Sequence, residues 1–332
     1  MKRLFLTLIF TLSTSIAFSQ EHIIKFATVA PEGSSWVGIM KEYDAAVRKE
    51  SGGKLGFRIY AGSVAGDEQD VLRKIRLGQF HSEGITGNGI SEIAKPVRIL
   101  DLPFFFNNTD EVDYILEKFD TELRAEFEKG GFVLLGWAEV GKVYIISKSP
   151  VSKVSDLKNI KMWQWEGDPV AAAMFDAIGI SPIQLKLQDV LTSLQTGLIT
   201  GAYSSPYAIV SLQWNTATQY LMEYPITNAS GAVVIAKRDF DKLPADLQQI
   251  LLKNGKSYMR KLTEQSRKDN AKSIDILKKN GMIFTKPDAN EAKGYGEIGK
   301  KARTALTGKL FSADLLGRVE KALAEFRAKG SK

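Results

Sequence analysis

The chain has 332 residues, 44% of them hydrophobic and 25% charged, with a formal net charge of +7 and no cysteine. The lack of cysteine excludes disulfides, cysteine-ligated metals and a lipid anchor on an N-terminal cysteine. The basic residues are spread along the sequence instead of forming a stripe, so nucleic-acid binding is not expected.

The first twenty residues have the pattern of a cleavable secretion signal. Lys2 and Arg3 give a basic start, an apolar run follows over 4–16, and small residues precede the expected cut. We therefore expect residues 1–20 to be a signal peptide, cut after Ser19 or Gln20, and the mature protein to be periplasmic. A retained membrane anchor is the alternative, which the shortness of the apolar run disfavours. Without Lys2 and Arg3 the net charge is +5.

The segment after the signal alternates strands with helices. Hydrophobic periodicity predicts three strands, with a helix after each of the first two, in the order 22–29, 34–50, 52–60, 67–77 and 81–87. The order strand-helix-strand-helix-strand predicts parallel pairing, with helices on the faces of the sheet.

The pattern continues to the C-terminus. A helix is expected over 110–130, extended segments over 132–140 and 142–148, strands over 160–165, 198–205 and 231–240, and helices over 168–178, 188–196 and 206–221. Beyond Pro244 the chain reads as almost wholly helical. Two α/β units in succession, followed by segments that return to them, predict a two-domain clamshell. Ligands of such folds bind in the crevice between the domains.

No catalytic or metal-binding motif stands out. The two histidines, His22 and His81, lie far apart and lack any metal-ligand spacing. The segment GYGEIG at 294–299 matches a dinucleotide-binding pattern, but it sits in a charged helical region with no strand before it. We therefore expect no enzyme activity, no metal and no cofactor.

Two tryptophans, Trp163 and Trp165, occur one residue apart in the strand expected over 160–165. Side chains alternate along a strand, so both rings should lie on one face. A pair of large rings on one face suits either the wall of a ligand site or packing between sheet and helix, and for Trp165 both interpretations stay open.

Several segments carry a family resemblance, in order from about residue 23 to 285. They are IIKFATVAPEGSSW, YAGSVAGDEQDVLRKIRLGQF, ILDLPFFF, SDLKNIKMW, IGISPIQLKLQDVLTSLQTGLITG and FDKLPADLQQILLKNG. The chain resembles the extracytoplasmic solute-binding proteins of tripartite ATP-independent periplasmic (TRAP) transporters, of the dicarboxylate-binding-protein type. The most specific element is DLK-x-x-K from residue 156, followed by DVLTSLQTG from residue 189.

The resemblance implies an α/β clamshell with hinge-crossing strands and long helices. Its domains would be 21–140 plus 229–268 and 141–228 plus 269–332. It also implies a receptor that captures a small solute and delivers it to the membrane subunits of a TRAP transporter. A periplasmic helical-repeat accessory protein is a further partner that the resemblance admits. The alternative is an exported enzyme or ligand carrier of the same fold that serves no permease.

The sequence departs from the family where organic-acid binders hold their ligand. Trp163 stands at the position of a carboxylate-binding Arg, and Val143 at that of a second basic residue. An unpaired carboxylate in a closed cleft is costly, so a dicarboxylate or a sugar acid is not expected. The expected solute is apolar or amphipathic, or else a cation held by tryptophan faces with Glu68 nearby.

The expected ligand-binding residues are aromatic, apolar or hydroxyl-bearing, apart from Glu68. They are Trp163, Ser204, Val143, Glu68, Thr86, Tyr207, Trp36 and Trp214. Trp163 leads this set because its position matches a ligand residue of the family. For Trp36 and Trp214 a packing role is the alternative, and for Ser204 the alternative is to close the end of a strand.

Overall fold

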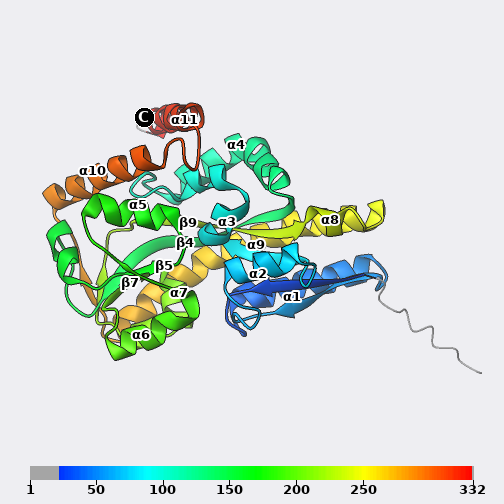
Figure 1. The fold of residues 1–332 in the computed structure, drawn as a ribbon, viewed down its shortest axis with the longest axis horizontal. Coiled ribbons are helices and arrows are strands. Elements are labelled where there is room, and N and C mark those ends of the chain that lie inside the picture. The colour runs from blue at the N-terminus through cyan, green and yellow to red at the C-terminus, as the bar shows by residue number, and fades with distance from the viewer. Residues whose placement is uncertain (1–21, 331–332) are drawn as a thin grey trace, which may run out of the picture.

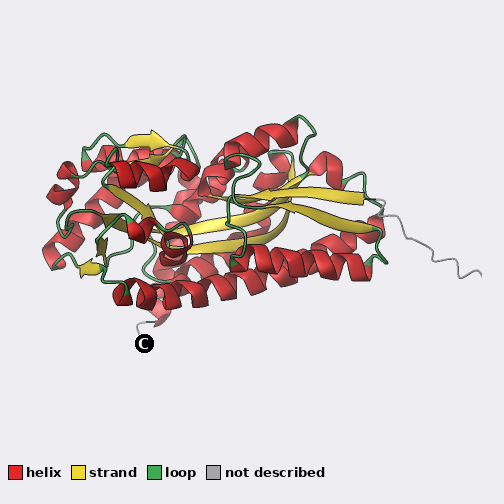
Figure 2. Cartoon of the chain, turned by 90° about the horizontal axis from the view of Figure 1, so that it is seen from below, coloured by secondary structure: helices red, strands yellow, loops and turns green. Residues whose placement is uncertain are grey.

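The computed structural model describes residues 22–330 (Figures 1 and 2). The predicted signal peptide, residues 1–20, and its cleavage site lie outside the described residues. The strands are β1 (His22–Thr28), β2 (Leu55–Tyr60), β3 (Ser82–Thr86), β4 (Phe132–Ser147), β5 (Trp163–Trp165), β6 (Ile183–Leu185), β7 (Gly201–Ser204), β8 (Tyr220–Met222), β9 (Thr227–Ala236) and β10 (Ile283–Thr285).

The α-helices are α1 (Ser35–Glu50), α2 (Glu68–Arg76), α3 (Gly87–Ile93), α4 (Thr109–Lys129), α5 (Pro169–Ile178), α6 (Val190–Thr196), α7 (Pro206–Ser211), α8 (Lys237–Phe240), α9 (Ala245–Lys279), α10 (Ala289–Leu306) and α11 (Ala313–Gly330). The 3-10 helices are η1 (Lys95–Asp101), η2 (Val154–Asn159), η3 (Leu187–Asp189) and η4 (Trp214–Thr216).

Two long antiparallel strands, β4 and β9, cross the middle of the molecule and join its two ends (Figure 2). The sheet order is β10-β8-β4-β9-β3-β1-β2, and β7 also pairs with β4. Strand β1 pairs in parallel with both β2 and β3, as the strand-helix alternation predicts. Strands β5 and β6 form a separate small parallel sheet.

The strands fall into two groups that we call the β1 half and the β7 half. In the β1 half, α1–α4 accompany β1–β3; in the β7 half, α5–α7 accompany β5–β8 and β10. The 35-residue helix α9 packs against β4, α1 and α7, and so bridges both halves (Figure 1). Helix α11 packs against α4, which places the last segment of the chain against the β1 half.

Strand β4 joins two segments that the sequence predicts as separate. Gly141 lies between them at a register shift, with a φ of +114° that side-chain-bearing residues rarely adopt. Its missing Cβ also makes room for the amide of Asn270 on α9. The strand therefore continues through a bulge instead of ending.

Two sequence predictions in this region are wrong in extent. The helix expected over 206–221 ends as α7 at Ser211, because Gln213 adopts a left-handed conformation, and β8 then pairs with β4 and β10. The strand expected over 231–240 begins earlier, at Thr227, and ends at Ala236, where pairing with β3 and β4 runs out and α8 begins.

Candidate functional site

A cleft with two adjoining lobes lies between the β1 half and the β7 half. We call them the polar lobe, with about 730 Å³ of empty space, and the apolar lobe, with about 680 Å³, both partly open to solvent. Residues from both halves line each lobe, and five line both lobes and so form their shared wall: Thr86, Val140, Trp165, Leu187 and Ser204.

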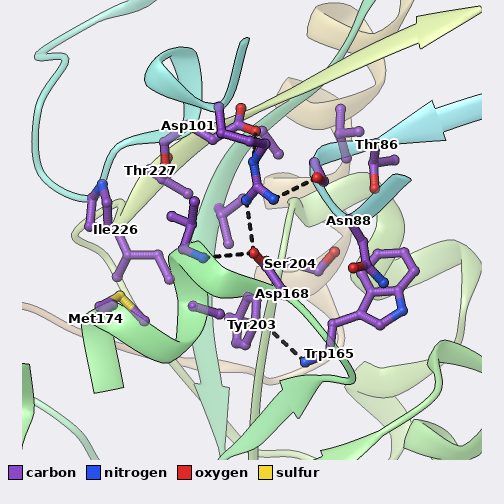
Figure 3. Close-up of a pocket in the computed structure, with 18 of the residues that line it drawn as sticks. Thr86, Asn88, Asp101, Trp165, Asp168, Met174, Tyr203, Ser204, Ile226 and Thr227 are labelled. Carbon is purple, nitrogen blue, oxygen red and sulfur yellow. Dashed lines mark hydrogen bonds and ion pairs between the residues drawn. The ribbon is translucent and has the colours of Figure 1, made fainter. Parts of the chain in front are cut away.

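The polar lobe is lined by three charged side chains that the sequence analysis does not single out. Arg98 lies in η1, Asp101 is the last residue of η1, and Asp168 lies in the loop before α5. The Arg98 Nε atom lies 2.8 Å from Asp101 Oδ2, and its Nη2 atom lies 3.0 Å from Asp168 Oδ1. In Figure 3, Asp168 lies near the middle of the lobe, with Asp101 beyond it. Two carboxylates facing one guanidinium give this wall a formal net charge of −1.

Burial shapes the ionisation of this group. Arg98 is 3% exposed, and burial opposes its charge, but Asp168 and Asp101 outweigh that effect and raise its pKa. Burial also raises the pKa of Asp101 above its ordinary value, against the lowering effect of Arg98. The ionised form of each of these side chains is therefore stabilised by its oppositely charged partners, because a buried charge without a partner has a high free-energy cost.

Trp165 stands between the two lobes. Its half-buried ring lines both of them, and its Nε1 atom donates a 2.9 Å hydrogen bond to Asp67 Oδ2. Figure 3 shows Trp165 and Asn88 on one side of the polar lobe and Met174 and Ile226 on the other. A solute in either lobe would meet one face or edge of this indole.

Trp163 lines the polar lobe from a packed position. Its ring is 1% exposed, stacks on Tyr203 at 4.9 Å between centroids, and meets Trp214 edge-on at 5.4 Å. Its Nε1 atom donates to the Leu185 carbonyl over 3.0 Å. The ring lies 6.0 Å from that of Trp165, as expected for two residues on one strand face. Its N–H group is thus already engaged, and only a small part of its surface faces the lobe.

The other predicted site residues divide into three groups. Val143 joins Trp163 in the polar lobe, Trp36 and Tyr207 line the apolar lobe, and Thr86 and Ser204 line both. Trp214 and Glu68 are absent from the lining of either lobe.

Glu68 is completely buried behind the lobe wall. Its carboxylate accepts hydrogen bonds from the Thr86 N–H at 2.8 Å and the Gly89 N–H at 2.6 Å. Burial, followed by the charge of Asp67, raises its pKa to about 8. Glu68 therefore supports the backbone that carries Thr86, and it is not placed to touch a solute directly.

Hydrogen bonds and an ion pair link the two halves beside the cleft. Asp67 Oδ2 accepts from Trp165 Nε1 and, at 3.2 Å, from the Leu187 N–H, and Lys186 Nζ lies 2.7 Å from Asp70 Oδ2. On the side of α1, the Ser35 N–H donates to the Tyr207 hydroxyl over 2.9 Å. These contacts join the β1 half to the β7 half, so the two halves are closed on each other while both lobes keep an opening to solvent.

Arg98 and Asp168 escape sequence analysis because the fold alone brings them together. The spacing of Arg98 and Asp101 is a weak local signal for an ion pair, and Asp168 is recognisable as the N-cap of α5. Within residues 22–330 there is no group of three or more His, Cys, Asp or Glu side chains placed to hold a metal ion. No helix in that range has the length and apolar character to cross a membrane.

Comparison with known proteins gives a consistent result. Residues 26–301 match the family model of bacterial extracellular solute-binding proteins, family 7. A solute-binding protein of Sulfitobacter sp. (strain NAS-14.1) is 25% identical over 318 residues, covering 93% of this chain and 94% of that protein. The 2,3-diketo-L-gulonate-binding periplasmic protein YiaO of Escherichia coli (strain K12) is 27% identical over 247 residues, covering 73% of this chain and 74% of that protein.

Solved structures show the same fold. A TRAP periplasmic solute binding protein from Desulfovibrio salexigens, with bound orotic acid, superposes with a TM-score of 0.84 at 18% identity. The superposition covers 91% of this chain and 99% of that one. The expected architecture, a two-domain α/β clamshell, is thereby confirmed.

Proposed function

The chain belongs to the bacterial extracellular solute-binding proteins of family 7, and on that premise we propose that it is the receptor of a TRAP-type transporter for an apolar or amphipathic solute. The observation that carries the solute class is the charge of the cleft. Among the described lining residues the charged ones are Arg98, Asp101 and Asp168, all in the polar lobe. No cation there is left for a ligand carboxylate.

The apolar surfaces of the cleft support the same solute class. The apolar lobe has no charged lining residue and is walled by Trp36, Trp165 and Leu212. Flat aromatic faces and aliphatic side chains favour a solute with a hydrocarbon or ring body. The names of YiaO and of the Desulfovibrio structure state acidic ligands for those proteins, and we propose a different class for this chain.

A cationic amphipathic solute is the second candidate. It is favoured by the net charge of −1 in the polar lobe, next to the indole ring of Trp165. A cation over an aromatic face gains about 0.5–2 kcal/mol, which is less than a full cage of rings would give. We rank it second because Arg98 already satisfies much of the carboxylate charge.

Native mass spectrometry of freshly purified protein tests the solute class, because a tightly held solute co-purifies. We expect a small neutral or cationic molecule with a large apolar part. Malate, succinate, fumarate and sialic acid should give little thermal stabilisation, since stabilisation grows with the ratio of ligand concentration to Kd. A rise of several degrees with any of these acids would contradict the proposal.

The cross-cleft contacts support the proposed delivery to a permease. A solute that touches both halves favours the closed form, and a membrane partner can distinguish that form from the open one. Genes for TRAP membrane subunits beside this gene would support the receptor role over a free-standing carrier or an exported enzyme. Conversion of a bound solute to a new product, in proportion to protein concentration, would favour the enzyme.

Three finer points belong to the same proposal. Cleavage after Ser19 or Gln20 is tested by N-terminal sequencing of the exported protein. The domain division expected from the sequence stays a prediction, and the packing of α11 on α4 favours assigning that helix to the first domain. A helical-repeat accessory protein as a second partner is tested by co-purification from the periplasm.

A further inference from the structure

We propose that Asp168 is a built-in counter-ion that occupies the ligand-facing edge of Arg98 and so excludes carboxylate solutes from the cleft. Asp168 is thus a specificity-determining residue of the receptor. The inference rests on the proposed function only in that it concerns the same cleft. It explains why a buried arginine in the ligand site does not make the site an acid-binding one.

The hydrogen-bond partners of Arg98 show which edge is blocked. The Nε atom faces Asp101, and the Nη1 atom donates to the Gly87 carbonyl and to Ser91 Oγ, all in the β1 half. The Nη2 atom lies 3.0 Å from Asp168 Oδ1, which belongs to the β7 half. Among the described partners of the guanidinium, Asp168 alone reaches it from across the cleft. A solute carboxylate would need that same edge.

The fold holds Asp168 in this place. Its side chain caps α5 by accepting from the Val170 N–H over 3.0 Å, and Pro169 starts the helix behind it. The same Oδ1 atom thus serves the helix cap and the ion pair. A carboxylate fixed by a helix cap loses little freedom on pairing with Arg98, whereas a free solute loses its translational and rotational freedom.

A third carboxylate, brought by the solute, would add to the charge imbalance. With Asp101 and Asp168 present, the wall already has one negative charge in excess. An anionic solute entering the polar lobe would therefore meet repulsion as well as an occupied guanidinium. Such repulsion lowers the affinity for anionic solutes without adding any contact to uncharged ones, and so gives the site its specificity.

Removing the charge of Asp168 should open the site to acids. Asparagine is as good an N-cap as aspartate, so Asp168→Asn leaves α5 capped. Arg98 and Asp101 then form a neutral pair, and the Nη2 edge faces the lobe. Arginine binds carboxylates through charge-assisted hydrogen bonds, which are stronger than hydrogen bonds between neutral groups.

The experiment compares benzoate with benzamide, which have the same shape and differ in charge. Binding is measured by calorimetry on the full mature protein and on the Asp168→Asn and Asp168→Ser variants, with melting curves for each. Asp288→Asn is the matched control, since Asp288 caps α10 and lines neither lobe. We expect the native protein and the control to prefer benzamide by about tenfold or more. Both Asp168 variants should bind benzoate about 10–100-fold more tightly than the native protein, with benzamide changed by less than about threefold.

Two results would overturn the inference. One is a folded Asp168 variant with no gain for benzoate; the other is a native protein that already prefers benzoate to benzamide. The second comparison needs no variant, so it can overturn the inference even if both substitutions prevent folding.

The outcome is separable from that of the proposed function. A native protein that co-purifies with an organic acid, or is stabilised by one, contradicts both the proposed solute class and the exclusion of carboxylates by Asp168, whereas a native protein that holds a polar, uncharged solute contradicts the proposed solute class alone. A native protein that holds an apolar solute, with variants that gain nothing, contradicts the role of Asp168 alone.

Discussion

Trp163 and Trp165 are neighbours on one strand face, yet they differ in burial and therefore in what their loss should do. Trp163 is packed between Tyr203 and Trp214 with 1% of its surface exposed, whereas Trp165 is half-buried and faces both lobes. Trp163→Ala should lower the free energy of unfolding by about 3–5 kcal/mol, the usual range for a buried aromatic residue. Trp165→Ala should cost less stability and weaken binding of the co-purified solute by about 2–4 kcal/mol.

Chemical denaturation and calorimetry on both variants separate these effects. Phe at either position is the control, because it keeps a ring while removing the indole N–H. A Trp163→Ala protein as stable as its parent but unable to bind would place the main ligand contact at Trp163 instead.

Glu83 should make stability depend on pH. It is fully buried, and within the described residues neither carboxylate oxygen has a hydrogen-bond partner. Burial, with the charges of Glu68 and Asp67, raises its pKa well above the ordinary value of 4.5. As the pH rises past that value the unfolded chain releases the proton while the folded chain retains it. The folded state then loses up to about 1.4 kcal/mol per pH unit.

Glu83→Gln removes this dependence and keeps a neutral side chain of the same size. The unfolding free energy of the variant minus that of the parent should therefore rise between about pH 5 and pH 8, with no trend below about pH 4. Denaturation midpoints measured across that range provide the check. Glu297→Gln, at an exposed position, should show no such rise, and a flat difference for Glu83→Gln would mean that Glu83 is ionised in the fold.

At the residue scale, the sequence could indicate which residue types line the cleft but not how its charges are paired. Val143, Thr86 and Ser204 were predicted as ligand-binding residues, and all line a lobe. Arg98 and Asp168 are far apart in the chain and lie in irregular segments, so no local pattern connects them. The absence of the family's arginine at position 163 gave no indication that Arg98, paired with two aspartates, lies in the same lobe.

At the scale of elements, the N-terminus of α2 meets the β7 half through an ion pair that should help hold the cleft shut. Lys186 Nζ lies 2.7 Å from Asp70 Oδ2, and this contact lowers the pKa of Asp70. Lys186→Met removes the ion pair and keeps the aliphatic stem. Because the pair is partly exposed, we expect solute affinity to fall by about 0.2–1 kcal/mol, with a smaller loss at high salt.

Calorimetry at low and high salt measures this effect. Lys242→Met is the matched control, because Lys242 pairs with Asp239 within one half of the molecule and should leave affinity unchanged. Equal effects of the two substitutions would show that the Lys186–Asp70 pair has no role in closure.

Element prediction succeeded where the signal was local. The N-caps Asp67 and Asp168 mark helix starts that the structure confirms to within a residue. It failed where pairing between strands far apart in the sequence determines the structure. Strand β8 forms because β4 and β10 lie beside it, and nothing in the local sequence at Gln213 indicates that the helix ends there. The bulge at Gly141 likewise depends on Asn270, on a helix much later in the chain.

At the scale of the whole molecule, the order of elements was sufficient to predict a clamshell, because alternating strands and helices build separate sheets. That the strands of both halves join in one eight-stranded sheet through β4 was not predictable from the order of elements, and only the family resemblance implied hinge-crossing strands. The joining requires β4 to run through a glycine bulge. The consequence is mechanical. We expect closure to bend or twist β4 and β9 and to change the packing of α9 on β4 and α7, which it contacts in this structure.

The closed state should therefore rest on contacts at both sides of the cleft. Ser35 meets Tyr207 on the side of α1, and Asp70 meets Lys186 on the side of α2. Removing one contact leaves the other, whereas the double variant Tyr207→Phe with Lys186→Met lacks both and keeps only the Asp67 hydrogen bonds and the Arg98–Asp168 ion pair among the cross-cleft contacts described above. We expect its solute-free form to populate the open state and to show a larger radius of gyration by X-ray scattering. Saturating solute should restore the radius of the native complex.

The apparent affinity of the double variant should equal the affinity of the closed form multiplied by the fraction of solute-free molecules that are closed. The two losses should add if the contacts are independent, because the sites share no partner. Tyr207 lines the apolar lobe, so its single variant measures any direct loss of solute contact. An unchanged radius in the solute-free double variant, at normal stability, would mean that the packing of β4, β9 and α9 sets the closed state and that these contacts follow it.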